Sequence, residues 1–461
     1  MLKSVLSFLS AVGHWLWRHK LVVLVAGLIT VAGAAAAVYA LNDDNGDDKA
    51  RVEAPAPEVI VREVPIPEDT DDLGFPAFAT KNTTRVAGPD PISDAAAVAL
   101  AVFPSTGGVA GPGAVTLVDV DDWQSGLAAS SLVAAPVGAP ILVTESGEVP
   151  AITSSAIRAL GPEGSSETAG RQIFTVGAAA KPDGFDSLEV EGANSAELAA
   201  GIDELRERLA GKPDHIVLVS SDEPALAMPA AAWAARSGDP VLFVQRESVP
   251  APTVEALERY KDVPVFVLGP ESAIEAKTMK EIKKLAPSAT RIGAEDATEN
   301  SVEFARYTEG TFGWDINDPG HGFVLANTTR PLDAGVASPL SASGTWGPLL
   351  VTESAGTLPA PLRGYLLDLK PGYADDPTRA LYNHIWLVGD TSAISVDFQA
   401  QVDEIAEVAP VTSGSGSEDV AVPPGTLEGD PTPGPADKPA DKPGNNSSSD
   451  ADAANADDGN K

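Results

Sequence analysis

A short segment that starts with proline and continues with mostly aliphatic residues occurs three times in this chain, at intervals of about 100 residues. The three copies are Pro140–Thr144 (PILVT), Pro240–Val244 (PVLFV) and Pro348–Thr352 (PLLVT). Because successive positions are apolar, we expect a strand that is buried on both faces, as in a parallel sheet covered by helices. The recurrence predicts tandem copies of one structural unit.

Other segments recur in the same order around each proline strand. An apolar strand lies upstream of each copy, at 115–118, 216–219 and 323–326. A strand that ends in glycine lies downstream of each copy, at 173–177, 265–269 and 385–389. Segments with helical patterns separate these strands, at 122–135, 151–160, 222–236, 252–261, 331–343 and 360–369. Since strands and helices alternate, we predict an α/β fold of three tandem three-layer βαβ-type units with short parallel sheets.

Each unit also opens with a similar segment before its first helix. The first and third openings begin with Arg85 and Arg291, whereas the second has Glu189 and no arginine. The same triplet, Ser-Ala-Ile, follows two of the three glycine-ended strands, at 272–274 and 392–394. From these marks we predict repeats at 81–186, 187–288 and 289–410.

The N-terminal part of the chain predicts a membrane anchor. Residues 21–41 carry no charge, and a helix of this length, roughly 31 Å, would span the hydrocarbon core. Basic residues precede this segment and aspartates follow it, so the N-terminus is expected in the cytoplasm and the body outside. We therefore predict that residues 1–41 form an uncleaved, single-pass signal anchor. The alternative is a signal peptide that is cleaved near Ala40, followed by secretion.

Composition narrows the classes of partner. The formal net charge is −35 and the chain has no cysteine. An acidic body repels nucleic acid, so we expect no nucleic-acid partner, and disulfides and thiol chemistry are excluded. The acidic, proline-rich segment 42–80 is expected to be a semi-rigid linker. The tail, 411–461, has too few bulky apolar residues to form a core, and we expect it to be disordered.

The order of these marks resembles the cell wall-binding repeat 2 family of Gram-positive surface proteins. In that family a unit opens with an Arg-hydrophobic-x-Gly-x-Asp segment, carries a Pro-Ile-Leu-Leu strand, and ends with a strand that runs into glycine. The resemblance covers about 81–410, and it implies three repeats with approximate threefold pseudo-symmetry. It also implies noncovalent attachment to an anionic wall polymer. The second opening, with Glu189, departs from the family pattern.

Candidate binding residues follow partly from this resemblance and partly from position. The resemblance suggests that the opening arginines, Arg85 and Arg291, contribute exposed charge to polymer binding, and that the proline strands line a shared ligand seam. The residues concerned in those strands are Pro140, Leu142, Pro240, Leu242, Pro348 and Leu350. Glu145 and Glu353 follow two of these strands, at the end where α/β proteins place ligands. The alternative for both glutamates is an ordinary solvated loop position, because the second unit has Arg246-Glu247 at the equivalent place.

The motifs of common enzymes are missing from the sequence. It contains no HxxxH or HExxH spacing for a metal and no Gly-x-Ser-x-Gly nucleophile motif. We therefore expect no catalytic residues, no metal and no cofactor. The predicted function is that of a membrane-anchored, extracytoplasmic envelope protein that associates noncovalently with cell-wall polymer or an envelope protein partner. The alternative is an enzyme acting on cell-wall glycan or its precursors, which would need paired carboxylates.

Overall fold

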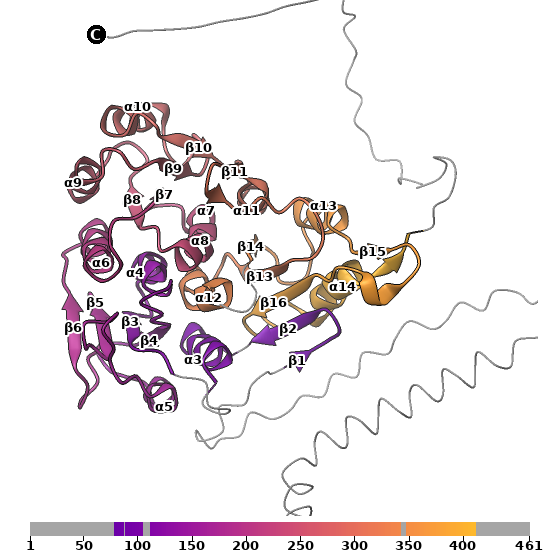
Figure 1. Ribbon diagram of the computed structural model, residues 1–461, viewed down its shortest axis with the longest axis horizontal. Coiled ribbons are helices and arrows are strands. Elements are labelled where there is room, and N and C mark those ends of the chain that lie inside the picture. The colour runs from indigo at the N-terminus through magenta and orange to yellow at the C-terminus, as the bar shows by residue number, and fades with distance from the viewer. Residues whose placement is uncertain (1–77, 87, 105–110, 343–346, 412–461) are drawn as a thin grey trace, which may run out of the picture. The chain divides into compact units, whose positions relative to one another are not determined.

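The structure is a computed structural model that describes residues 78–86, 88–104, 111–342 and 347–411 (Figure 1). The predicted anchor at 21–41, the linker up to residue 77 and the tail after residue 411 lie outside the described residues. Among the helices that are described, none combines the length and the apolar character needed to cross a bilayer.

Three small sheets form the body, which confirms the predicted α/β fold. The first sheet has the order β4-β3-β5-β6, with β3 Val115–Asp119, β4 Ile141–Thr144, β5 Ile173–Val176 and β6 Ser187–Val190. The second has the order β8-β7-β9-β10, with β7 Ile216–Ser220, β8 Val241–Val244, β9 Val265–Leu268 and β10 Thr290–Ile292. Both sheets are entirely parallel.

The third sheet is mixed. Its order is β14-β13-β16-β2-β1, with β1 Phe78–Ala79, β2 Thr83–Val86, β13 Gly322–Asn327, β14 Leu349–Thr352 and β16 His384–Val388. Only the pairing of β1 with β2 is antiparallel in this sheet. The three proline strands are β4, β8 and β14, and each is completely buried, as predicted.

Helices occur at equivalent places in the three units. Opening helices follow the opening strands: α3 Pro91–Val102, α6 Ser195–Ala210 and α11 Ala297–Arg306. Central helices follow the first long strand: α4 Trp123–Ala129 with η1 Ser130–Leu132, α7 Pro224–Ala227 with α8 Pro229–Ser237, and α12 Leu332–Ala342. The proline strands are followed by α5 Ala151–Leu160, α9 Ala251–Arg259 and α13 Ala360–Asp368.

The glycine-ended strand is followed by a further helix in two of the units. These helices are α10 Ala276–Leu285 and α14 Val396–Ala406, whereas the first sheet has a helix-free connection at 177–186. The remaining short elements are β11 Thr308–Glu309, β12 Phe312–Gly313, β15 Gly372–Tyr373, η2 Pro377–Arg379 and β17 Ala409–Pro410.

The three predicted tandem units are not self-contained in the structure, because they exchange strands. The fourth strand of each sheet is the opening strand of another repeat. Strand β6 lies beyond the predicted boundary at 186 and pairs with β5, and β10 likewise pairs with β9. The opening strand of the first repeat, β2, pairs with β16 near the far end of the body. The sequence marks define repeats, but each sheet needs a strand from the next repeat in cyclic order.

Each opening segment therefore joins two sheets. Helix α6 packs on β8 and α9 of the second sheet, and α11 packs on β14 and α13 of the third. Helix α3 packs on β4 and α5 of the first sheet, although its strand β2 belongs to the third. Residues 78–102, which hold β1, β2 and α3 and which we call the closing segment, thus connect the last sheet to the first.

The central helices α4, α8 and α12 contact one another (Figure 1). Helices α4 and α12 approach closely at a pair of glycines, because a Cβ added to Gly335 would lie 2.5 Å from the carbonyl oxygen of Gly126. Any larger side chain there would force the helices apart. One continuous apolar core extends through all three sheets. The repeats are therefore coupled by packing as well as by strand exchange.

Candidate functional site

Both opening arginines make internal contacts, and the expectation that they are exposed is wrong for Arg85 and only partly met by the half-buried Arg291. Their contribution to polymer binding stays a prediction. Arg85 lies on β2 and is only 3% exposed. Its guanidinium donates hydrogen bonds of 2.7–2.9 Å to the carbonyl oxygens of Gly389, Asp390 and Ile394, and two more to the side-chain oxygen of Gln399. Burial lowers the pKa of Arg85 to about 10, and nearby aspartates partly offset this effect.

Arg291 on β10 makes the same type of contact in the second sheet. It is half-buried and donates to the carbonyl oxygens of Gly269, Pro270 and Ile274 at 2.6–2.7 Å. Burial also lowers the pKa of this arginine. In both sheets the acceptors belong to the turn that carries the Ser-Ala-Ile triplet. The arginine and the triplet are therefore two halves of one contact, which fastens an opening strand to the preceding turn.

The first sheet lacks both halves of this contact. Glu189 replaces the arginine on β6, and its side chain forms an exposed ion pair of 3.0 Å with Lys181. No Ser-Ala-Ile triplet follows Gly177, and the connection to β6 contains no helix. This sheet is thus open where the other two are closed by an arginine.

The candidate residues of the proline strands are buried. The side chains of Leu142, Leu242 and Leu350 are at most 1% exposed, and the prolines before these strands are buried as well, at 140, 240 and 348. In this conformation they build the core and offer no surface to a polymer. The direct role in ligand binding suggested for these prolines and leucines stays a prediction. Glu145 and Glu353 are exposed in the loops after β4 and β14, and their role in ligand binding also stays a prediction.

The switch point at the carboxyl end of each sheet, which we call its crevice, is lined differently in each of the three sheets. It lies between the ends of the central strand and its neighbour, where the two connections lead away to opposite sides. This is the usual ligand position in open α/β sheets. The register of the strands places Asp122, Glu223 and Arg330 at equivalent positions after the central strand. The helix that faces this position contributes Leu198 from α6 to the first sheet, Asn300 from α11 to the second, and Asp94 from α3 to the third.

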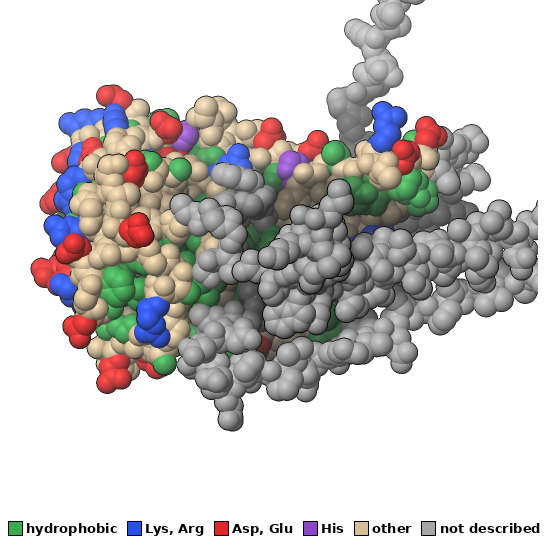
Figure 2. All heavy atoms as spheres, turned by 60° about the horizontal axis from the view of Figure 1, so that its bottom comes forward, with side chains coloured by type: hydrophobic (Ala, Val, Ile, Leu, Met, Phe, Trp, Pro, Cys, Tyr) green, Lys and Arg blue, Asp and Glu red, His purple; other side chains and the backbone are tan. Residues whose placement is uncertain are grey.

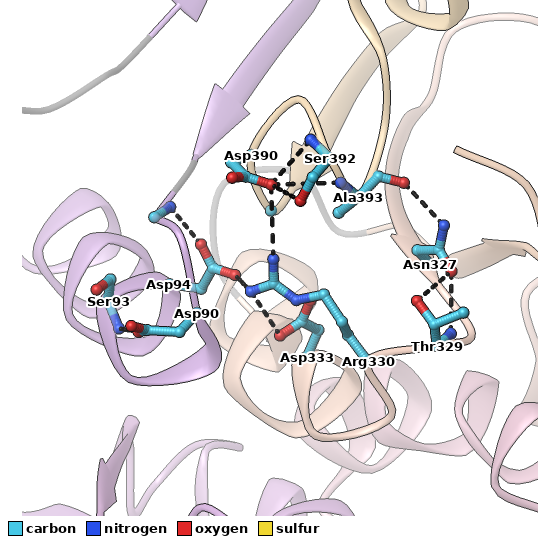
Figure 3. A network of polar contacts seen from close by, with 12 residues as sticks. Asp90, Ser93, Asp94, Asn327, Thr329, Arg330, Asp333, Asp390, Ser392 and Ala393 are labelled. Atoms are coloured by element: carbon cyan, nitrogen blue, oxygen red, sulfur yellow. Dashed lines mark hydrogen bonds and ion pairs between the residues drawn. The ribbon is translucent and has the colours of Figure 1, made fainter. Parts of the chain in front are cut away.

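In the third sheet, the protein's own charged side chains occupy the crevice. Figure 3 shows the guanidinium of Arg330 between Asp94 of α3 and Asp333 of α12, with Asp390 on another side. Arg330 donates from Nη2 to Asp94, its Nε lies 2.9 Å from Oδ2 of Asp333, and its Nη1 lies 4.0 Å from Oδ1 of Asp390. The amide of Gly88 donates to the other oxygen of Asp94 at 2.5 Å.

In the second sheet, an amide takes the place of the charges. The side chain of Asn300 donates to the carbonyl oxygen of Leu226 at 3.0 Å. By the register of the strands, Leu226 corresponds to Asp333 of the third sheet. Arg291 ties the same junction to the neighbouring turn, so this crevice is also held by the protein itself.

The crevice of the first sheet is a cavity of about 560 Å³. It is lined by the loop after β3, the turn after β5 and the start of α6, through Asp121, Asp122, Gln124, Gly177, Ala178, Glu191, Gly192, Ala193, Asn194, Ser195 and Leu198. Asp121 and Glu191 are exposed. Asp122 caps α4, because it accepts from the amide of Ser125 at 2.9 Å. We call this the first-sheet cavity.

The first-sheet cavity offers mainly hydrogen-bond acceptors. At the start of α6, Asn194 accepts from the amide of Glu197 at 3.0 Å, and Glu197 accepts from the amide of Ala193 at 2.9 Å. An anion at this cavity would meet the carboxylates of Asp121, Asp122 and Glu191. Within the described ranges, no three His, Asp or Glu side chains are placed to hold a metal ion. Sequence reasoning missed this site, although its signal was present as the aspartates after the strand at 115–118.

A second polar group lies at the opposite, amino end of the second sheet. Nε2 of His215 forms a hydrogen bond of 3.0 Å with the hydroxyl of Thr311, and its Nδ1 lies 3.0 Å from Oδ2 of Asp239. Asp239 is buried and also accepts from the indole of Trp233 at 2.8 Å and from the amide of His215 at 2.9 Å. Hydroxyl, imidazole and carboxylate thus follow one another in the order of a catalytic relay.

Comparisons with known proteins identify the fold. No protein-family model matches the chain, and neither does any curated protein sequence. Among solved structures, Cwp6 from Clostridium difficile matches with a TM-score of 0.56 and 17% identity, over 70% of this chain and 47% of that one. Cwp8 from the same organism matches with a TM-score of 0.55 and 18% identity, over 71% and 52%. The chain shares their fold and spans about half of their length.

Proposed function

We propose that this protein is a membrane-anchored envelope protein whose body associates noncovalently with cell-wall polymer or with an envelope partner. The observation that carries the proposal is the fold shared with the Clostridium cell-wall proteins Cwp6 and Cwp8. The predicted anchor at 21–41 and the three repeats at 81–186, 187–288 and 289–410 are part of the proposal. The pairwise contacts among α4, α8 and α12 support an approximate threefold pseudo-symmetry.

The ligand, in this proposal, enters the first-sheet cavity. The equivalent crevices of the other two sheets hold Arg330 and Asn300, which are side chains of the protein itself. Carboxylates at the cavity accept hydrogen bonds from hydroxyl or ammonium groups, so a neutral glycan or an amine-bearing wall chain fits better than an anionic polymer. The internal use of Arg85 and Arg291 supports this choice, and Figure 2 shows basic side chains interspersed with acidic ones on the described part of one face.

Exchanging the two exposed carboxylates of the cavity for amides should weaken wall binding. For Asp121→Asn combined with Glu191→Gln, we expect at least about a tenfold loss in affinity for isolated walls, because two charge-assisted hydrogen bonds become neutral ones. Both residues are exposed, so the free energy of unfolding should change by less than about 0.5 kcal/mol. The measurement is sedimentation of the full chain with purified walls over a range of protein concentrations.

The matched control is Glu145→Gln combined with Glu353→Gln, which changes the net charge equally at the ends of β4 and β14. We expect this variant to bind walls like the wild type. If it loses binding while the cavity variant does not, the ligand lies on those loops instead. Failure of the wild type to sediment with walls would argue against a wall ligand altogether.

We propose that the relay at His215 is structural and that the protein is not an enzyme. Asp239 has three donors, which fix the core in place whether or not a substrate binds. The relay also lies at the amino end of β7, away from the crevices. Thr311→Val should therefore leave both the release of reducing ends from isolated walls and wall binding unchanged. Wall hydrolysis by the wild type that disappears in Thr311→Val would instead establish a catalytic relay.

A further inference from the structure

Two buried aspartates share one guanidinium where the closing segment meets α12. The side chains of Asp94 and Asp333 have no exposed surface, and that of Arg330 is 14% exposed. A buried carboxylate is stable when it is paired and hydrogen-bonded, and a second carboxylate on the same cation is not fully compensated. The pair therefore carries more negative charge than its single cation can balance (Figure 3).

The surrounding charges do not restore the balance. Asp390 adds a third carboxylate beside Arg330, and Asp90 lies at the start of α3. Arg85 is the other cation near Asp94, but its donors are used by carbonyl groups and Gln399. The other elements packed on α3 and α12 carry few charged side chains, and α4, η1, β4 and β13 carry none. Helix α5 has the exposed Arg158, and α8 has Arg236, which stacks on Trp314. Strand β16 has His384, which is hydrogen-bonded to Thr84 of β2.

One proton resolves the imbalance. Burial raises the pKa of both Asp94 and Asp333 well above the ordinary aspartate value, and Arg330 offsets only part of this effect. The pair is then neutralised by one guanidinium and one proton. An unfolded chain has no such pair, and its aspartates release their protons near pH 4.

We propose that the closing segment is a proton-dependent clasp, in which one proton shared by Asp94 and Asp333 holds α3 against α12. The folded protein keeps this proton at pH values where the unfolded or opened chain has released it. The contribution of the pair to stability is therefore complete at low pH and is lost as the pH rises. Because the closing segment joins the last sheet to the first, its release would open the body at that junction alone.

Hydrogen exchange on the full chain tests this proposal. At pH values between 5.5 and 8, peptides from residues 78–102 should exchange faster as the pH rises, beyond the intrinsic pH effect, by up to about tenfold per pH unit for one linked proton. In Asp94→Asn this additional pH dependence should disappear. Asparagine is the natural residue at the equivalent position of α11, Asn300, so the substitution fits the site. Asp333→Asn is the second variant and should behave in the same way.

Helix α11 provides the control within the same sample. It occupies the equivalent place at another junction without a buried carboxylate pair, and its peptides should show only the intrinsic pH effect. Equal pH dependence of α3 and α11 in the wild type would overturn the proposal. It would also be overturned if both asparagine variants kept the wild-type pH dependence. Neither result bears on wall binding, which is measured separately.

Discussion

Replacing Arg85 with alanine should lower the free energy of unfolding by roughly 3–5 kcal/mol. The change leaves the buried carbonyl oxygens of Gly389 and Ile394 and the partly buried one of Asp390 without their donor, and each unsatisfied buried acceptor costs about 1–3 kcal/mol before relaxation. It also detaches β2 from the turn after β16. Urea denaturation of the full chain, followed by circular dichroism, measures the change.

Two further variants bracket this effect. Arg291→Ala should cost less, because that arginine is only half-buried and water can replace part of its bonding. Lys181→Ala removes one exposed ion pair with Glu189 and should cost less than about 1 kcal/mol. If Arg85→Ala unfolds at the same urea concentration as Lys181→Ala, the guanidinium of Arg85 does not hold β2 to the turn after β16.

Truncation of the central leucine of any proline strand should destabilise the whole body. Leu142, Leu242 and Leu350 are fully or almost fully buried in β4, β8 and β14, and a buried leucine changed to alanine typically costs about 2–5 kcal/mol. Because the sheets exchange strands and share one core, we expect a single transition that moves to lower urea in all three variants. Calorimetry and denaturation of the full chain test both the size and the number of transitions.

An exposed leucine serves as the control. Leu381 is 57% exposed, and Leu381→Ala should change the free energy of unfolding by less than about 0.5 kcal/mol. Three separate transitions, of which each core variant shifts only one, would mean that the repeats unfold independently. In that case the exchanged strands would contribute little to cooperativity.

Local features of the fold could be predicted from the sequence. The apolar run at 140–144 marks β4 to within one residue, and the amphipathic segment 151–160 coincides with α5. Such patterns work because burial on both faces of a strand demands apolar residues at successive positions. The repeat of these patterns was sufficient to predict three α/β units with equivalent central strands.

The partners of the opening strands could not be predicted. A strand such as Thr83–Val86 shows in its sequence that it is extended, but its register with β16 depends on contacts made far along the chain. Arginine is also rarely buried, so Arg85 was expected at the surface. A signal for its true role was present, since arginine and the Ser-Ala-Ile triplet occur together or are missing together. The first-sheet cavity could not be predicted either without knowing which strands pair, because its walls come from both sides of a repeat boundary.

The position of strand β2 has a consequence for the order in which the chain can fold during synthesis. It is delivered early, yet Arg85 and its acceptor Gly389 are separated by 304 positions. At ordinary rates of synthesis, on the order of tens of seconds pass before β16 emerges. Until then, β2 lacks its parallel partner strand, and pairing it requires closing a loop of this length, which slows folding. The first repeat must therefore remain incomplete until the last repeat has been made.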